Sequence, residues 1–194
     1  RENAGPADVP AEDDFDLTVL TVEGASLPGP GVARHVAEET GAPTSGVYLP
    51  TAPLASIAGG VAMAARSAEV ALLRLSALGI DPADVRTIAG DAPLAPVAAD
   101  ERTAMARTND AIAHGARVYV VAEEAPTDPD ELAFGAVADQ PRSFADIFAA
   151  VDWDLDAVDW RTFAPAQVTL DVPGGETYAA GELAEDRLAE VLAI

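Results

Sequence analysis

The chain has 194 residues, 49% of them hydrophobic and 23% charged, which is enough for one domain with a substantial core or for two small ones. Its 33 acidic and 11 basic residues give a formal net charge of -22, and this charge excludes nucleic acids and anionic membrane surfaces as partners. Cysteine is absent, so disulfides, thiolate catalysis and cysteine-bound metals are excluded as well.

The first quarter of the chain is expected to combine short strands with one helix. Residues 1–13 are expected to form an acidic linker, because prolines and carboxylates stand there instead of a periodic apolar pattern. Branched residues over 15–22 predict a buried strand. A helix is expected over 32–40, where Gly41 ends it, and a short strand over 47–49.

A long apolar segment over residues 53–78 dominates the sequence. Proline stands at its start, glycine follows its end, and few polar residues interrupt it. These features predict one long, buried helix. No uninterrupted apolar run in the chain approaches the roughly 20 residues needed to span a bilayer, so a membrane location is not expected.

The rest of the chain alternates between strand and helix patterns. Strands are expected over 85–88 and 117–122, a hairpin over 168–178, and helices over 100–114, 143–151 and 182–192. This alternation with one local hairpin predicts an α/β (α+β) fold, in which helices cover one or both faces of a mixed sheet.

Four aspartates alternate with apolar residues over 152–159. We interpret this stretch as a solvated acidic loop that Trp153 and Trp160 fix to the core. Calcium binding is the alternative, but the spacing and the glycine of an EF-hand loop are missing.

The long apolar segment contains one pair of opposite charges, Arg66 and Glu69, three residues apart on one helix face. A surface ion pair is the simpler interpretation and would contribute only a few tenths of a kcal/mol. The apolar surroundings favour a position at the wall of a cleft instead. Gly59 and Gly60 weaken a helix by about 1 kcal/mol each, which indicates either that a ligand approaches the backbone there or that helices pack tightly.

The remaining polar candidates carry less information. We expect His35, paired with Glu38, and His114, near a helix end, to be solvated. A metal site would need a third ligand that the spacing does not supply, so no metal is expected. The run 108–110, Thr-Asn-Asp, serves either a pocket or the solvent-facing side of its helix.

Several motifs follow one another in a fixed order. They are Ala52-Pro53-Leu54-Ala55-Ser56-Ile57-Ala58-Gly59, Ala65-Arg66-x-x-Glu69, Ala92-Pro93-Leu94-x-Pro96-Val97, Asp100 with Ala104-Met105-x-x-Thr108-Asn109-Asp110, Phe163-Ala164-Pro165-Ala166-Gln167-Val168 and Tyr178-x-x-Gly181. From about residue 14 to residue 194, this order resembles methenyltetrahydromethanopterin cyclohydrolases. The acidic composition is similar to that of halophilic archaea.

The resemblance implies hydrolysis of a 5,10-methenyl tetrahydropterin cation to a formyl derivative in one-carbon metabolism, without a metal or redox cofactor. It implies two α/β domains with a pocket between them and a homo-oligomer, a trimer. The Arg and Glu of the family's active site correspond to Arg66 and Glu69. We take Glu69 as the base that removes a proton from water and Arg66 as the residue that orients its carboxylate. The same motifs supply the candidate substrate-binding residues, which are Ser56, Gly59, Gly60, Pro93, Thr108, Asn109 and Asp110.

The chain departs from the family pattern in two respects. Leu54 and Ala62 stand where Thr and Gln are expected, which removes two hydrogen-bonding groups. Family members are also longer, so we expect residues 14–194 to correspond to their C-terminal portion. A non-catalytic pterin-binding or assembly protein is the alternative function, and a plain acidic structural subunit is a weaker one. The choice between tetrahydromethanopterin and tetrahydrofolate stays open.

The net charge also predicts the setting in which the chain works. At -22 the chain repels itself in dilute buffer, whereas molar salt shortens the Debye length to about 3 Å. A salt-rich cytoplasm is therefore the expected compartment.

Overall fold

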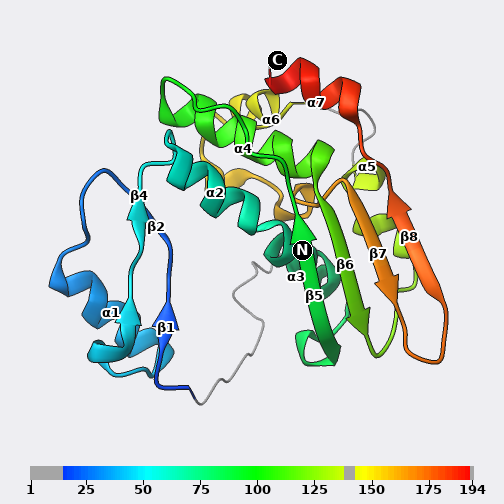
Figure 1. The fold of residues 1–194 in the computed structure, drawn as a ribbon, viewed down its shortest axis with the longest axis horizontal. Coiled ribbons are helices and arrows are strands. Elements are labelled where there is room, and N and C mark those ends of the chain that lie inside the picture. The colour runs from blue at the N-terminus through cyan, green and yellow to red at the C-terminus, as the bar shows by residue number, and fades with distance from the viewer. Residues whose placement is uncertain (1–14, 138–142, 193–194) are drawn as a thin grey trace.

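A computed structural model describes residues 15–137 and 143–192 (Figure 1). The linker expected over residues 1–13 lies outside the described residues. Within them, no helix is both long and apolar enough to cross a membrane.

A mixed four-stranded sheet forms one side of the molecule (Figure 1). The order of its strands is β5 (Val85–Asp91), β6 (Arg117–Ala122), β7 (Gln167–Asp171) and β8 (Thr177–Gly181). The central pair β6 and β7 is parallel and the two outer pairs are antiparallel. This arrangement confirms the predicted mixed sheet and its hairpin.

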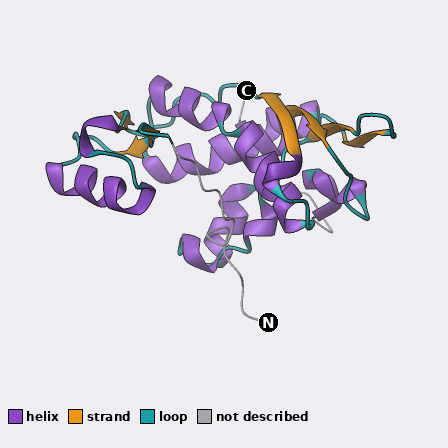
Figure 2. Ribbon diagram, turned by 90° about the horizontal axis from the view of Figure 1, so that it is seen from below, coloured by secondary structure: helices purple, strands orange, loops and turns teal. Residues whose placement is uncertain are grey.

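One face of the sheet is buried under helices, as the view in Figure 2 shows. Val118, Val120 and Leu170 point to the buried face, whereas Arg117 and Tyr119 alternate with them and are exposed. The helices are α2 (Ile57–Ala65), α3 (Ser67–Ala77), α4 (Glu101–Gly115), α5 (Phe134–Val137), α6 (Phe144–Ala150) and α7 (Glu185–Leu192). The α/β fold class is therefore confirmed, with α3 and its neighbouring helices packed on one face of the sheet.

The prediction of a single long, buried helix over 53–78 is wrong. The segment forms two helices, α2 and α3, and Arg66 lies between them with φ -72° and ψ -4°. No proline or glycine marks this break, so its cause lies in tertiary packing. The exposure of Ile57 and Val61 also shows that α2 is only partly buried.

The N-terminal part forms a small unit at the left of Figure 1, built from β1 (Thr18–Val19), β2 (Val22–Glu23), α1 (Pro30–Thr40), β3 (Val47–Tyr48) and β4 (Thr51–Ala52). β1 pairs with β3 and β2 pairs with β4, both in parallel. The expected strand over 15–22 is thus interrupted, opposite Pro50, which has no N–H to donate. It is also largely exposed rather than buried, because the ladder is short and α1 is the main described helix that packs against it.

An aromatic cluster fixes the segment that connects the two parallel strands, β6 and β7. Phe134, Phe144 and Phe148 are fully buried and pack ring against ring, and Phe148 also contacts Trp153. The aspartates of the stretch 152–159 are exposed. The interpretation of this stretch as a solvated acidic loop is confirmed for its aspartates and for Trp153, which packs on the core, whereas Trp160 lines a cleft instead.

Candidate active site

A cleft of about 690 Å³ separates the N-terminal strands from the helices. The segment 19–23 lines one wall and α2 and α3 line the opposite wall. Further lining residues include Met105, Trp160 and Phe163. Most lining side chains are apolar, and the polar ones are few. This composition and size are typical of sites for small organic molecules, which measure about 300–1,000 Å³.

Arg66 and Glu69 form an ion pair at the wall of this cleft. The Nη2 atom of Arg66 lies 2.9 Å from Oε1 of Glu69, and its Nε atom donates to Oε2 at 3.2 Å. Both side chains are about half exposed, at 44% and 53%. The two-point contact fixes the plane of the carboxylate while leaving it accessible from the cleft.

The break between α2 and α3 determines where this pair lies. The N–H of Arg66 bonds to the carbonyl of Met63 at 3.0 Å, and the Arg66 carbonyl accepts from the N–H of Val70 at 2.8 Å. Arg66 therefore ends one helix and begins the next, and Glu69 lies in the first turn of α3. The sequence pattern placed both residues within one regular helix, so this junction was not predicted.

A second carboxyl group, from Glu23 at the end of β2, lines the same cleft. Partial burial and the neighbouring Glu101 carboxyl raise the pKa of Glu23. Glu101 in turn accepts a hydrogen bond from the N–H of Ala55 at 3.0 Å. Glu23 was not among the predicted site residues, because it is the pairing of β2 with β4 that brings it to the helices.

Apolar side chains give the cleft flat and flexible surfaces. Met63 and Met105 face it together with the rings of Trp160 and Phe163. Leu54 and Ala62, the two departures from the family pattern, also line the cleft. The residues that replace the expected hydrogen-bonding groups are therefore in a position to contact a ligand.

Of the predicted substrate-binding residues on and just before α2, one lines the cleft and two do not. Gly59 lines the cleft, and a Cβ atom there would lie 2.3 Å from the Pro53 carbonyl oxygen. Ser56 is the N-cap of α2, and its hydroxyl accepts from the N–H of Gly59 at 3.0 Å. Among the described residues, neither Ser56 nor Gly60 lines the cleft. Tight packing against the preceding turn accounts for Gly59.

Of the substrate-binding residues predicted further along the chain, Asn109 lines the cleft, whereas Thr108 and Pro93 do not. Asn109 lines the cleft, and its amide donates to the Met105 carbonyl at 2.8 Å. Thr108 is buried, and its hydroxyl bonds within α4 to the carbonyl of Ala104. Pro93 packs near Gly115 instead of lining the cleft. For Thr108 and Pro93, the described structure thus provides no direct contact with the cleft.

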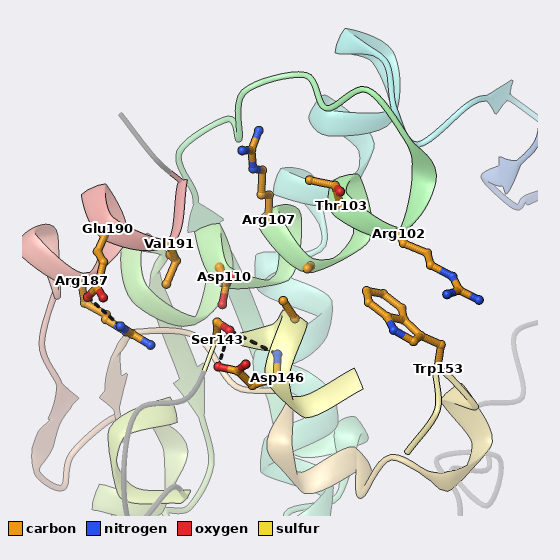
Figure 3. Close-up of a pocket in the computed structure, with 12 residues that line it drawn as sticks. Arg102, Thr103, Arg107, Asp110, Ser143, Asp146, Trp153, Arg187, Glu190 and Val191 are labelled. Carbon is orange, nitrogen blue, oxygen red and sulfur yellow. Dashed lines mark hydrogen bonds and ion pairs between the residues drawn. The ribbon is translucent and has the colours of Figure 1, made fainter. Parts of the chain in front are cut away.

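Asp110 lies on the opposite side of α4, where it lines a second cavity of about 420 Å³ (Figure 3). Its Oδ1 atom accepts a hydrogen bond from the N–H of Phe144 at 2.8 Å and lies 3.9 Å from Nε2 of His114. Both side chains are only 3% exposed. The expectation of a solvated His114 is therefore wrong, since α5 and α6 cover this end of α4 and the ring packs against Phe134. His35 is exposed, as expected, but it faces Glu39 rather than Glu38.

Asp110 and His114 are expected to make the free energy of unfolding depend on pH in opposite directions. Burial raises the pKa of Asp110 from 3.8 to about 6 and lowers the pKa of His114 from 6.5 to about 4. Between pH 4 and 6 the folded state holds the extra proton on Asp110, so that contribution to stability falls as pH rises. The unfolded state takes up the extra proton at His114, so that contribution rises with pH, and the two largely cancel in the wild type.

Asp110→Asn is expected to remove one of these slopes. The stability of this variant should rise with pH between 4 and 6 more steeply than that of the wild type, by on the order of 2 kcal/mol over the window. His114→Gln should show the reverse, a fall in stability as pH rises. Urea unfolding at several pH values in molar KCl measures the stability of both variants. If stability depended on pH in the variants as it does in the wild type, the shifted pKa values of Asp110 and His114 would be contradicted.

Among the described residues, no group of three or more histidine, aspartate or glutamate side chains is arranged to hold a metal ion. The chemistry that the described cleft supports rests on its carboxylates, its arginine and its apolar walls. A carboxylate held by an arginine fork beside an apolar surface is suited to bind an organic cation and to take a proton from water.

Comparison with known proteins gives concordant matches. Residues 7–192 match the family described as Cyclohydrolase (MCH). The methenyltetrahydromethanopterin cyclohydrolase of Halobacterium salinarum is 46% identical over 178 residues, which cover 92% of this chain and 57% of the relative. Proteins of the same name from Methanothermobacter marburgensis and Rhodopirellula baltica are 35% and 38% identical, with 91% and 90% of this chain and 58% and 54% of the relatives covered. The chain thus spans somewhat more than half the length of these relatives.

Proposed function

Because the chain belongs to the cyclohydrolase (MCH) family, we propose that its cleft binds a 5,10-methenyl tetrahydropterin cation and hydrolyses it to the formyl derivative. The observation that carries the proposal is the two-point ion pair of Arg66 and Glu69 at the wall of an apolar cleft. The family resemblance assigns the same two residues to catalysis.

The proposed substrate explains why a carboxylate and an apolar wall suffice. Its methenyl carbon lies between two nitrogens and shares their positive charge, so it is already electrophilic. The Glu69 carboxylate offsets part of that charge when the cation enters the cleft. Trp160 and Phe163 offer ring surfaces to a planar pterin.

In the proposed reaction, Glu69 takes one proton from a water molecule while the water oxygen bonds to the methenyl carbon. The resulting adduct carries a hydroxyl group on that carbon. One carbon–nitrogen bond then breaks, its electron pair stays on nitrogen, and the protonated Glu69 returns its proton to that nitrogen. The hydroxyl proton passes to solvent, so the cation and water yield the formyl product and one proton.

Arg66 is proposed to orient the base rather than to touch the substrate. Its guanidinium fixes both oxygens of the Glu69 carboxylate, so one lone pair keeps a constant direction into the cleft. Positioning of water and base in this way converts a slow bimolecular step into one within a preformed site.

The test is the loss of methenyl absorbance when the protein is mixed with substrate in molar KCl, corrected for spontaneous hydrolysis. Substrates built on tetrahydromethanopterin and on tetrahydrofolate are compared, because the sequence leaves the choice between these two carriers open. Turnover of either one supports the proposal. Binding of both without turnover would favour a pterin-binding protein instead.

We also propose a homo-oligomer, a trimer by the family resemblance, in a salt-rich cytoplasm. Exposed apolar side chains support self-association, namely Ile57 and Val61 on α2 and Leu94 and Val97 in the segment after β5. Light scattering of the protein in molar KCl tests it, and a monomer over the micromolar range would contradict it.

A further inference from the structure

The junction between α2 and α3 packs on strand β5 at Gly90. A Cβ atom on Gly90 would lie 2.7 Å from the Ser67 hydroxyl oxygen and 3.3 Å from the backbone nitrogen of Ala68. The distance to the Ser67 hydroxyl is shorter than real Cβ atoms show, and the distance to Ala68, like the 3.2 Å to Cγ2 of Val118, is tight, so the start of α3 approaches the strand at a position that favours glycine. The described glycines with positive φ are at 41, 79, 174 and 181, so Gly90 is not among them. Glycine is therefore favoured at position 90 because of the limited space and not because of an unusual backbone conformation.

Ser67 is unusual among the buried residues because its side chain makes no hydrogen bond within the described structure. It is 0% exposed, and its hydroxyl oxygen has no partner among the described residues. Burial of an unsatisfied hydroxyl costs about 1–3 kcal/mol. Ser67 therefore does not stabilise the fold through hydrogen bonding. Its hydroxyl instead fills the space next to Gly90.

Ser67 lies directly between the two residues of the proposed catalytic pair. Arg66 precedes it, and Glu69 follows two residues later on the same turn. Arg66 holds this turn at both ends, through its N–H to Met63 and its carbonyl to Val70. A shift of Ser67 away from β5 would therefore move Arg66 and Glu69 together, relative to the opposite wall of the cleft.

We propose that Ser67 and Gly90 are positioning residues, whose contact sets the place and direction of the Arg66–Glu69 pair in the cleft. The inference rests on the proposed function, since it concerns the same carboxylate. Neither residue lines the cleft in the described structure, so their effect is exerted through the pair and not through contact with substrate.

The test is a set of three variants, Gly90→Ala, Ser67→Ala and the double variant. Gly90→Ala is expected to lower kcat by about 10- to 100-fold with a smaller change in KM, because displacements near 1 Å at a reacting group cost rates of that order. Ser67→Ala alone should lower kcat less than Gly90→Ala does, because it loosens the contact with β5 without pushing the start of α3 away from the strand. The double variant should recover most of the activity that Gly90→Ala loses, because the hydroxyl that causes the closest contact is gone and only the tight contacts with Val118 and Ala68 remain.

Gly175→Ala serves as the matched control. Its Cβ atom would also meet a neighbour, Val172 at 3.2 Å, but in the β7–β8 hairpin, where no residue of the pair is near. A general loss of stability would lower the activity of this control as well, whereas mispositioning would not. If Gly90→Ala does not fold, recovery of folding and turnover in the double variant supports the proposal, and failure to recover overturns it.

A second readout is independent of turnover. The Nε–H of Arg66 donates to Glu69 and should give a resolved arginine side-chain resonance, which Arg66→Lys removes and so assigns. This resonance should shift in Gly90→Ala and return in the double variant. An unshifted resonance with wild-type kcat in Gly90→Ala would overturn the inference while leaving the proposed function intact. Absence of turnover in the wild type would overturn the proposed function, and the resonance would still decide whether the contact positions the pair.

Discussion

Glu69→Gln is expected to lower the turnover of the methenyl substrate by about 10²- to 10⁴-fold, the usual cost of losing a general base. The amide keeps the size of the side chain and an oxygen that can accept from Arg66, but it cannot take a proton from water. Substrate binding should be weakened much less than turnover, because the apolar walls of the cleft are unchanged. The measurement is the rate of loss of methenyl absorbance, together with the equilibrium binding of the substrate.

The chain offers a matched control for this substitution. Glu123 forms a similar two-point ion pair with Arg86 on the exposed surface, and Glu123 does not line the cleft. Glu123→Gln therefore removes an equivalent carboxylate without touching the proposed site, and full activity is expected. Equal losses of activity in both variants would indicate an effect of charge on the whole protein. Full activity in Glu69→Gln would show that the Arg66–Glu69 pair has a structural role and not a catalytic one.

Arg74→Ala is expected to destabilise the fold by about 2–4 kcal/mol. The Arg74 side chain is buried in α3, and its Nε atom donates to the carbonyl of Glu131 at 2.7 Å. It also reaches the carbonyl of Arg161, at 3.5 Å, in the 3₁₀ turn Trp160–Thr162 that carries one wall of the cleft. Truncation leaves both carbonyls without this donor and opens a cavity beneath them.

Urea unfolding of Arg74→Ala measures this loss. Arg117→Ala is the control, because Arg117 pairs with Asp91 on the exposed face of the molecule and such pairs contribute little. The midpoint of Arg117→Ala should stay close to that of the wild type. A midpoint of Arg74→Ala that also stays unchanged would show that the turns it contacts are held by other interactions.

The elements that the sequence predicted well are those with a local physical cause. The strand expected over 117–122 forms as β6, and the helix expected over 143–151 begins at Ser143, whose hydroxyl accepts from the N–H of Asp146. The hairpin expected over 168–178 forms as β7 and β8. In each case, the residues that determine the structure are neighbours in the sequence.

The features that sequence reasoning missed depend on contacts between distant segments. The break at Arg66 has no local signal and coincides with the contact of Ser67 with Gly90, which lies on another element. The burial of His114 depends on α5 and α6, and Glu23 reaches the cleft through pairing of β2 with β4. Arg66 and Glu69 do line the cleft, as expected from opposite charges within a mainly apolar segment, where an ion pair is costly unless a cleft admits solvent.

The most direct test of the account is a crystal structure of Glu69→Gln with the methenyl substrate bound. The account predicts that the pterin lies in the cleft, between the strand segment 19–23 and α2, with the methenyl carbon within about 4 Å of the side chain at position 69. A pterin bound in the second cavity beside Asp110, or one in the cleft whose methenyl carbon points away from position 69, would contradict it.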